Sequence, residues 1–297
     1  MNIVTWNIQV ALGIDGRIDA SRIAETVKEL GENDIICLQE VTRESSFSPT
    51  RGREYSGLAD ELASHFPEYE MFYGSAVDRP AVDGSESQGR YYFGNMILAK
   101  VPVQFLFSHK LPQPSDPTTR AMPREALEIL VEFNGEPLRI ITTHLEYFAI
   151  DQRKAQLNYL MRYQEECCER FEKPSPSGTG SYIAPPETDR TIMCGDFNME
   201  VNSEHYNFFT KSGFTKSGST EPGLTESGGI ADAWNVVHGS IPHSPTCGIF
   251  DHEQWPNGEH CRDFFLISPP LEAHTTGLIV NTETQASDHQ PVRLCLE

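Results

Sequence analysis

Basic side chains are scarce in this sequence. Among its 297 residues are 23 lysines and arginines but 43 aspartates and glutamates, which gives a formal net charge of −20 at pH 7. A surface this acidic repels a polyphosphate backbone at long range. Duplex DNA is therefore disfavoured as a partner, although a local basic groove can exist on an acidic protein, and enzymes that hold divalent cations concentrate carboxylates.

A cysteine framework and a long apolar run are also missing. The seven cysteines are an odd number without a Cys-x-x-Cys pair, so we expect them to be reduced. No run is long enough to cross a bilayer, and no basic segment followed by an apolar one stands at the N-terminus. These absences predict a cytoplasmic protein that does not bind membranes. Its length and its 38% hydrophobic content predict a single domain over residues 1–297, and we expect a monomer.

The apolar pattern predicts an α/β chain of many strands. Strands are expected over residues 2–9, 34–40, 69–73, 94–99, 101–108, 125–133, 138–145, 192–194, 264–268, 274–280 and 292–296. Helices are expected over residues 58–66, 150–171, 203–210 and 231–237, and from the Asp19 and Ser21 caps to Leu30. Residues 77–91 and 238–260 are predicted loops, and residues 172–189 a surface excursion. Short turns between the strands from 94 to 145 indicate an antiparallel meander.

The stretch from Thr191 to Glu200 is the first candidate for a site. Its apolar residues predict a short buried strand, after which Gly195 lets the backbone turn. Residues two apart in an extended chain share a face, so Asp196 and Asn198 can converge on one small anionic or hydrated ligand. Taken alone, the same pair can equally build an ordinary turn.

Polar side chains also end or follow the other predicted strands. They are Asn7, Glu40, His144, Asp263, Asp288 and His289. If these strand ends meet at one rim, their polar groups gather there. Buried acids need a partner, and Mg²⁺ takes one or two carboxylates plus water and substrate phosphate, so Glu40 and Asp288 are candidates for its ligands. Asp263 could orient the imidazole of His289, either for general base chemistry or as a phosphate-binding imidazolium.

The complete set of motifs resembles the endonuclease/exonuclease/phosphatase superfamily, which has the pancreatic-DNase-like fold. The matching motifs are Thr5-Trp6-Asn7, Leu38-Gln39-Glu40-Val41, Gly94-Asn95-Met96-Ile97-Leu98, Thr143-His144-Leu145-Glu146, Gly195-Asp196-Phe197-Asn198, Ala231-Asp232-Ala233-Trp234 and Ser287-Asp288-His289. They cover the chain from near residue 3 to near residue 293. The resemblance implies a four-layer α/β sandwich of two mostly antiparallel sheets flanked by helices, with one catalytic centre at their rim.

The resemblance also implies a role for each matching residue. The implied metal shell is Asn7, Glu40 and Asp288, with Glu40 the direct ligand of Mg²⁺ or Mn²⁺. The implied catalytic residues are Asp196 and Asn198, which orient water and phosphate, the dyad of Asp263 and His289, and His144, which holds a phosphoryl oxygen. Asn95 and Arg124 are the implied substrate-binding residues. The family's general base has been placed on Asp196 or on the dyad, and both assignments stay open.

The sequence departs from the family pattern just before Asp263. Family members usually carry an arginine two residues before this acid and an apolar residue directly before it, whereas this chain has Cys261 and Arg262 there. Cys261 and three residues of the preceding loop could together ligate zinc. The other three are Cys247, His252 and His260. Because their spacing is irregular, a substrate loop that carries unrelated cysteines and histidines is the preferred interpretation.

The sequence as a whole predicts a Mg²⁺-dependent phosphoester hydrolase, in which a positioned water attacks in line without a covalent enzyme intermediate. The charge favours a small or single-stranded substrate for this phosphodiesterase or phosphatase. One alternative is a DNA-repair nuclease, including a tyrosyl-DNA phosphodiesterase-like enzyme. Another is a catalytically silent protein that binds a partner in the cleft, which is disfavoured because every expected catalytic position is filled.

Overall fold

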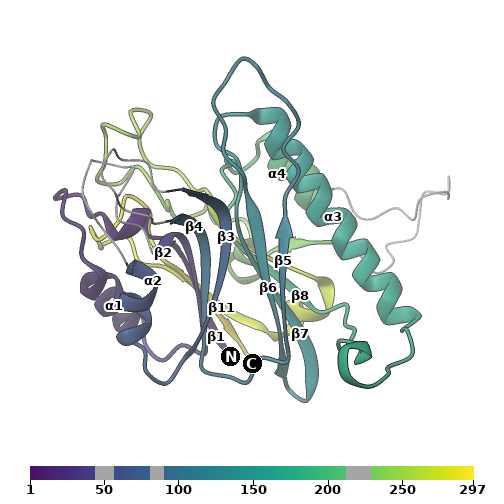
Figure 1. Cartoon of the computed structure of the whole chain (residues 1–297). Helices are drawn as coiled ribbons and strands as arrows, with labels where there is room; N and C mark the ends of the chain where they lie inside the picture. The colour runs from purple at the N-terminus through teal and green to yellow at the C-terminus, as the bar shows by residue number, and fades with distance from the viewer. Residues whose placement is uncertain (44–56, 81–89, 212–228) are drawn as a thin grey trace.

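The structure is a computed structural model that describes residues 1–43, 57–80, 90–211 and 229–297. Two six-stranded sheets pack face to face, and helices cover both outer faces (Figure 1). Each sheet contains one parallel strand pair, and all its other pairs are antiparallel. The predicted four-layer α/β sandwich is therefore confirmed.

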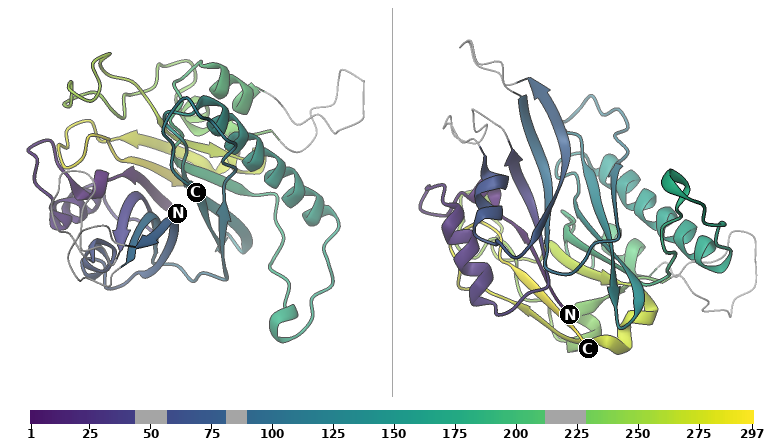
Figure 2. Two further views of the ribbon diagram at one scale, coloured as in Figure 1. Left: turned by 45° about the horizontal axis from the view of Figure 1, so that its top comes forward. Right: turned by 60° about the horizontal axis from the view of Figure 1, so that its bottom comes forward.

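The first sheet has the strand order β11-β12-β1-β2-β4-β3. Its strands are β1 (Asn2–Asn7), β2 (Ile35–Arg43), β3 (Glu70–Pro80), β4 (Arg90–Ala99), β11 (Thr275–Val280) and β12 (Val292–Leu296). The chain begins and ends in this sheet, where the amino group of Met1 donates to the carbonyl of Leu296. The two termini accordingly lie side by side in every view (Figures 1 and 2).

The second sheet has the order β5-β6-β7-β8-β10-β9. Its strands are β5 (Phe105–Lys110), β6 (Glu125–Phe133), β7 (Glu136–His144), β8 (Thr191–Asp196), β9 (Ala231–Asp232) and β10 (Asp263–Ile267). Apolar side chains fill the space between the two sheets. Ile3 and Cys37 come from the first sheet, and Ile140 and Cys194 come from the second.

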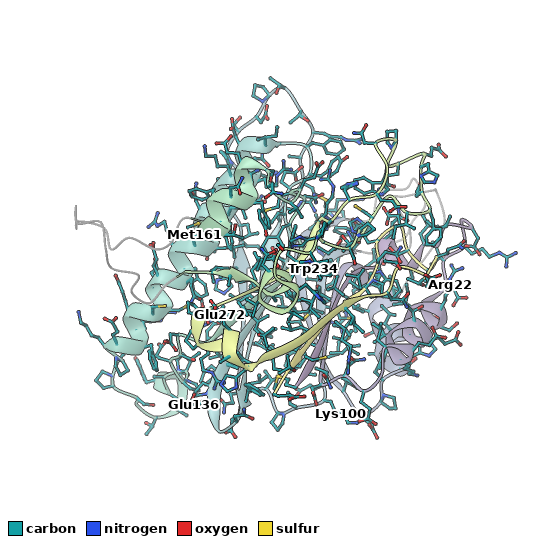
Figure 3. All side chains as sticks on the ribbon, turned by 180° about the vertical axis from the view of Figure 1, so that it is seen from behind. Arg22, Lys100, Glu136, Met161, Trp234 and Glu272 are labelled. Atoms are coloured by element: carbon teal, nitrogen blue, oxygen red, sulfur yellow. The ribbon has the colours of Figure 1, made fainter. Side chains whose placement is uncertain are left out.

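Helices shield the outer face of each sheet. The first sheet carries α1 (Ala20–Glu29) and α2 (Leu58–Ser64), and the second carries α3 (Ile150–Glu172) and α4 (Glu204–Lys211). Figure 3 shows this from behind, with Arg22 of α1 and Met161 of α3 on opposite sides of the sheets. The remaining helical segments are α5 (Ala233–His238) and the short 3-10 helices η1 (Gln9–Ala11), η2 (Gly180–Tyr182) and η3 (Pro269–His274). None of the helices in the described part of the chain is long and apolar enough to cross a membrane.

The parallel pairs explain why polar residues gather at one rim. β1 and β2 are parallel, with Asn7 opposite Gln39, and β7 and β8 are parallel, with His144 opposite Asp196. The carboxyl ends of parallel neighbours lie at the same edge of a sheet. Since the two sheets pack with these edges together, residues far apart in the sequence meet at one place.

Two strand predictions were wrong in their extent. The strand expected over residues 101–108 lies at 105–110, and the expected four-strand meander is divided, because the chain leaves the first sheet after Ala99 and enters the second at Phe105. Pro102 in this crossing lacks the N–H that a ladder requires. The polar loop expected over residues 77–91 is shorter, because Val77 to Pro80 pair with residues 90–93 of β4. Residues 81–89 of that loop lie outside the described residues.

Two further boundaries also differ from prediction. The helix expected over residues 231–237 begins at Ala233, because Ala231 and Asp232 pair with β10 and the Asp232 side chain then accepts a hydrogen bond from the Trp234 N–H at the helix start. The strand expected from residue 274 begins at Thr275, after η3.

Gly195 has a different role from the one predicted. It lies inside β8, one residue before the strand ends, with a φ of 131°. A Cβ atom there would lie 2.0 Å from the carbonyl oxygen of Thr143 on β7. Glycine is therefore required by the close approach of the two backbones, and the chain does not turn at this residue.

Candidate active site

An amide at the end of β1 connects the two sheets. Asn7 Nδ2 donates to Asp196 Oδ2 at 3.1 Å and to Glu40 Oε1 at 3.2 Å. Its Oδ1 accepts from the backbone N–H of Gln9 at 3.1 Å, which fixes the orientation of the amide. In this geometry Asn7 orients the two acids through its N–H groups. Its predicted place in the metal shell stays a prediction.

Glu40 occupies an irregular point in β2. The pairing of β2 with β4 shifts register between Leu38 and Val41, and Glu40 has a φ of 59°. Such a conformation costs a non-glycine residue on the order of 1 kcal/mol or more, and it is commonly found at functional sites. The bulge places the carboxylate beside Asn7 and His144, with Glu40 Oε1 at 3.8 Å from His144 Nδ1.

Asp196 lies among hydrogen-bond donors from three segments. Besides the Asn7 amide, its Oδ1 accepts from the Asn198 N–H at 2.9 Å, and His144 Nε2 lies 3.4 Å from its Oδ2. The Asn198 side chain turns back to donate to the Leu145 carbonyl at 2.9 Å, which its positive φ of 50° permits. Asp196 and Asn198 thus both lie at the cleft, but the Asn198 side-chain amide donates to Leu145, and the predicted convergence of the two side chains on one ligand stays a prediction.

His289 lies between two carboxylates. Its Nδ1 pairs with Asp263 Oδ2 at 2.8 Å, and its Nε2 lies 3.8 Å from Asp196 Oδ2. β10 and β8 set this spacing, because they place Asp263 directly opposite Asp196. The Trp6 indole donates to the backbone carbonyl of His289 at 2.9 Å and helps to hold the residue in place. The predicted dyad is therefore present as a contact.

The surrounding charges decide which of these groups is ionised. Burial would lower the pKa of His289, but Asp263, Asp288 and Asp196 together raise it well above its ordinary value. Burial would raise the pKa of Asp196, but His289 and His144 bring it below its ordinary value. The pKa of Asp263 is raised to about 6, because burial raises it by more than the positive charge of His289 lowers it. The arrangement at neutral pH is thus an imidazolium between carboxylates.

Glu40 and Asp288 are acids whose pKa values stay raised although the positive charge of His289 acts on both of them. Burial, and then repulsion from Asp288, raises the pKa of Glu40 to about 7. Burial likewise raises the pKa of Asp288, although His289 and the Trp255 indole oppose it. Asp288 Oδ2 accepts from Gln254 Nε2 at 2.8 Å and from Trp255 Nε1 at 3.2 Å. Two oxygen ligands that repel each other, one partly buried and one buried, fit a hard divalent cation.

Arg124 provides positive charge at the same cleft. Its Nε donates to Glu146 Oε2 at 3.1 Å, while its buried Nη1 has no hydrogen-bond partner. His144 Nδ1 is another buried nitrogen without a partner, and burial, followed by the charge of Arg124, lowers the pKa of His144 to about 3. Unpaired buried polar atoms are costly unless a ligand completes them. Arg124 and His144 therefore fit an anionic group in the cleft.

A cleft of about 660 Å³ contains most of the predicted site. Its lining includes these predicted residues: Asn7, Glu40, Arg124, His144, Asp196, Asn198, Asp288 and His289. Asp263 lies behind His289 and does not line the cleft. Asn95 donates to the Glu125 carbonyl at 3.1 Å and lines a small neighbouring cavity with Arg124 and His144. Its substrate-binding role stays a prediction.

Sequence reasoning missed the other wall of this cleft. The missed lining residues are Arg120, Ala121, Met122, Glu146, Tyr147, Phe148, Gln254 and Trp255. They lie in segments without apolar periodicity, so no strand or helix pattern pointed to them. Glu146 stands in the motif Thr143-His144-Leu145-Glu146, and that motif is the sequence signal that could have found it. In the structure Glu146 forms an ion pair with Arg124.

The zinc alternative does not assemble. Cys247 Sγ lies 3.2 Å from His260 Nε2, but that nitrogen already accepts from Arg262 Nε at 2.7 Å, and Cys261 Sγ is directed to the Asp263 carbonyl instead. Among the residues that the structure describes, the only cluster of three or more metal-ligating groups is Asp196, Asp263 and His289. In that cluster His289 Nδ1 is already paired with Asp263.

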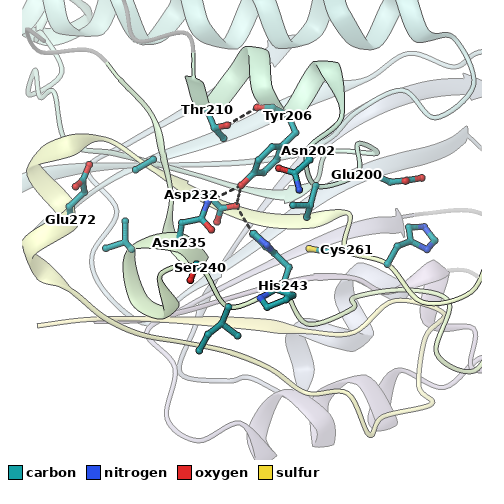
Figure 4. A pocket seen from close by; sticks show the side chains of 16 residues that line it. Glu200, Asn202, Tyr206, Thr210, Asp232, Asn235, Ser240, His243, Cys261 and Glu272 are labelled. Atoms are coloured by element: carbon teal, nitrogen blue, oxygen red, sulfur yellow. Dashed lines mark hydrogen bonds and ion pairs between the residues drawn. The ribbon is translucent and has the colours of Figure 1, made fainter.

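A second cavity, of about 930 Å³, lies beside α4 and α5 and contains none of the predicted catalytic, substrate-binding or metal-shell residues, although His260 and Cys261 of the zinc alternative line it (Figure 4). Its buried acid is Asp232, which accepts from the Tyr206 hydroxyl at 2.8 Å and from His243 Nε2 at 2.7 Å. The Trp234 N–H donates to the other oxygen of the same carboxylate. Because this acid is fully paired within the protein, the smaller cleft is the candidate active site.

Comparison with known proteins agrees with the geometry. Residues 4–289 match the family model described as the Endonuclease/Exonuclease/phosphatase family. The chain belongs to this family. Its members are phosphoester hydrolases that generally depend on a divalent metal, and the predicted resemblance is confirmed. The search of curated proteins found no significant match to this chain.

Several solved structures share the fold of this family member. An endonuclease/exonuclease/phosphatase from Beutenbergia cavernae matches with a TM-score of 0.67 at 20% identity, covering 100% of this chain and 71% of that one. The Bacteroides thetaiotaomicron mannosyl-6-phosphatase matches with a TM-score of 0.63 at 16% identity, covering 100% and 99%. A humanized D. rerio TDP2 matches with a TM-score of 0.57 at 19% identity, covering 100% and 98%. At these identities the likeness concerns the fold.

Proposed function

We propose that this protein is a Mg²⁺-dependent hydrolase of small phosphoesters, with Mn²⁺ as an alternative ion. The observation that carries the proposal is the arrangement of charge in one cleft. Two acids, the partly buried Glu40 and the buried Asp288, have raised pKa values, and the unpaired Nη1 of Arg124 lies in the same cleft. A cation site beside an anion site is what a metal-assisted phosphoester hydrolase requires.

The ion supplies one part of the chemistry. Glu40 and Asp288 would hold the ion, and its chemistry there would be to polarise a phosphoryl oxygen and to neutralise the charge that develops on the leaving oxygen. The chain positions the substrate with its own groups, since Arg124 Nη1 and His144 donate to phosphoryl oxygens. Asn7 keeps Glu40 and Asp196 oriented toward the same point.

The protein also orients the water and takes its proton. Asp196 is an ionised carboxylate at the cleft that can accept the proton of a water, whereas His289 already carries a proton and stabilises the negative charge of the transition state. The water oxygen bonds to phosphorus as the bond to the leaving oxygen breaks in line. This assignment favours Asp196 as the base, with Asp263 holding the imidazolium in place.

The net charge of the protein favours a small substrate over a long one. A net charge of −20 disfavours a long polyanion, while a small ester meets only the groups inside the cleft. The mannosyl-6-phosphatase that shares the fold is an example of a family member named for such a substrate.

A panel of phosphoesters tests the proposal. Monoesters, small diesters, single-stranded and duplex DNA should be incubated with the protein in Mg²⁺, in Mn²⁺ and in EDTA. We expect turnover of small esters that EDTA abolishes and Mg²⁺ restores. Turnover in EDTA would overturn the metal role, preferred cleavage of duplex DNA would establish the repair-nuclease alternative, and no turnover of any ester would leave the silent binding protein.

A further inference from the structure

The wall of the cleft that sequence reasoning missed is aromatic. The Tyr147 and Phe148 rings meet edge to face at 4.7 Å, and the Trp255 ring lies 6.0 Å from Tyr147. Trp255 also lies 5.7 Å from the ring of His289, so the aromatic surface continues to the catalytic dyad. We call Tyr147, Phe148 and Trp255 the aromatic wall.

Part of this wall is exposed to solvent. Phe148 is 43% exposed and Tyr147 is 36% exposed. The backbone beneath them is held firmly, because Arg153 Nη1 donates to the carbonyls of Glu146 and Tyr147 and the Phe148 N–H donates to Glu146 Oε1. Exposed rings on a fixed backbone beside a cleft are a preorganised binding surface.

Arginines accompany the rings, although the chain has few basic residues. The Arg120 guanidinium lies 4.2 Å from the centre of the Phe148 ring. The Arg262 guanidinium lies 5.4 Å from Tyr147 and 5.1 Å from Trp255. Guanidinium planes and aromatic faces are the surfaces on which planar rings stack, and arginine also attracts the negative charge of a phosphate.

We propose that the preferred substrate is a phosphoester that carries a planar aromatic ring, such as a nucleobase, and that this ring stacks on Phe148 with its edge toward Tyr147 while the phosphoryl group lies at Arg124. This inference rests on the proposed function and specifies its substrate class. The arrangement places a ring site and a phosphoryl site in one cleft of about 660 Å³, which accommodates a mononucleotide-sized ligand.

A matched pair of substrates isolates the ring. Adenosine 5′-monophosphate and ribose 5-phosphate release their phosphate from the same kind of alcohol, so a difference in kcat/KM reports the base. If the protein prefers diesters, the methyl esters of both compounds serve the same purpose. Stacking on an aromatic side chain should raise kcat/KM for the nucleotide by roughly tenfold or more.

Phe148→Leu removes the ring and keeps an apolar side chain at an exposed position, so folding should be unaffected. We expect this variant to lose most of the nucleotide preference, measured as the ratio of kcat/KM for adenosine 5′-monophosphate to kcat/KM for ribose 5-phosphate. Tyr182→Leu is the matched control, because Tyr182 is 83% exposed in the excursion after α3, does not line the cleft, and should leave the preference unchanged.

Binding keeps the inference testable without turnover. Calorimetry with Asp196→Asn protein should give a Kd for adenosine 5′-monophosphate at least about tenfold lower than that for ribose 5-phosphate. Equal Kd values, or a nucleotide preference that Phe148→Leu retains, would overturn the inference. If neither compound is turned over but the nucleotide binds preferentially, the proposed function fails while the ring site stands.

One further experiment distinguishes a free nucleotide from the end of a nucleic acid strand as the source of the ring. A single-stranded oligonucleotide that ends in the same 5′-phosphorylated adenosine offers the same ring and phosphate with many additional charges. With a net charge of −20 we expect the free nucleotide to have the lower Kd and the higher kcat/KM. A preference for the oligonucleotide that still depends on Phe148 would support the ring site and assign it to a strand end.

Discussion

The dyad makes the most specific prediction about the mechanism. Asp263 Oδ2 and His289 Nδ1 are buried and lie 2.8 Å apart. Of the charges that raise the pKa of His289, that of Asp263 has the largest effect. Asp263→Asn keeps the shape of the side chain and removes its charge. His289→Ala removes the imidazole itself. Each change should lower kcat by about 10² to 10⁴-fold, the range for a lost proton-transfer or transition-state group.

The double variant distinguishes a unit from two independent residues. If Asp263 acts through His289, then Asp263→Asn with His289→Ala should be no slower than His289→Ala alone. Single-turnover kinetics should be used, so that product release does not hide the chemical step. A double variant slower by the product of the two single factors would refute the coupling. Asp60→Asn, on the exposed face of α2, is the control and should leave kcat unchanged.

The pH profile gives the same prediction a second readout. Because Asp263 raises the pKa of His289, removing its charge lowers that pKa, and the imidazolium is then lost at a lower pH. In Asp263→Asn the high-pH decline of kcat should therefore shift to lower pH than in the wild type. An unchanged profile would mean that Asp263 has only a packing role.

The remaining predictions concern substrate choice and stability. Binding of duplex DNA by Asp196→Asn protein in Mg²⁺ should stay weaker than micromolar at physiological salt, and a salt titration that gives submicromolar affinity with a steep slope would contradict the small-substrate proposal. Glu128→Gln should lower the free energy of unfolding at pH 7 by up to about 3 kcal/mol, because the buried Arg139 loses the nearer of its two counter-charges, at 2.8 Å, and keeps Glu187 at 3.9 Å. Burial would raise the pKa of Glu128, but hydrogen bonding from His109 and the charge of Arg139 bring it below the ordinary 4.5, so this stabilisation is present at neutral pH and lost as the pH falls through the folded-state pKa. Urea unfolding should show that the difference in the free energy of unfolding between the wild type and Glu128→Gln is smaller at acid pH than at pH 7. An equal difference at both pH values would contradict a stabilising role for the Glu128 charge.

The sequence predicted which residues meet at one rim better than it predicted the strand boundaries. Asn7, His144 and Asp196 could be found because each ends an apolar run, and parallel strands bring such ends together. Glu40 was found in the same way, although the bulge that orients it has no sequence signal that we recognised. The patterns near residue 101 failed because an alternating strand does not reveal which of two sheets it joins.

The aromatic wall could not be predicted for a different physical reason. Trp255 lies in a loop and Tyr147 and Phe148 lie between β7 and α3, where neither a two-residue nor a 3.6-residue period applies. Their proximity depends on the tertiary arrangement of segments about a hundred residues apart. The role of Gly195 could not be predicted either, because a close approach of two backbones and a turn both require glycine, and the sequence does not distinguish them.

The Mg²⁺ dependence of phosphoester hydrolysis tests the central claim most directly. Initial rates should be measured against Mg²⁺ concentration for chelator-treated wild type, Glu40→Gln, and the exposed control Glu25→Gln. We expect no activity without the ion, a saturable recovery for the wild type and the control, and a much higher Mg²⁺ requirement for Glu40→Gln because one of two carboxylate ligands is lost. Full activity in chelator, or the same Mg²⁺ curve for Glu40→Gln and the wild type, would contradict the account.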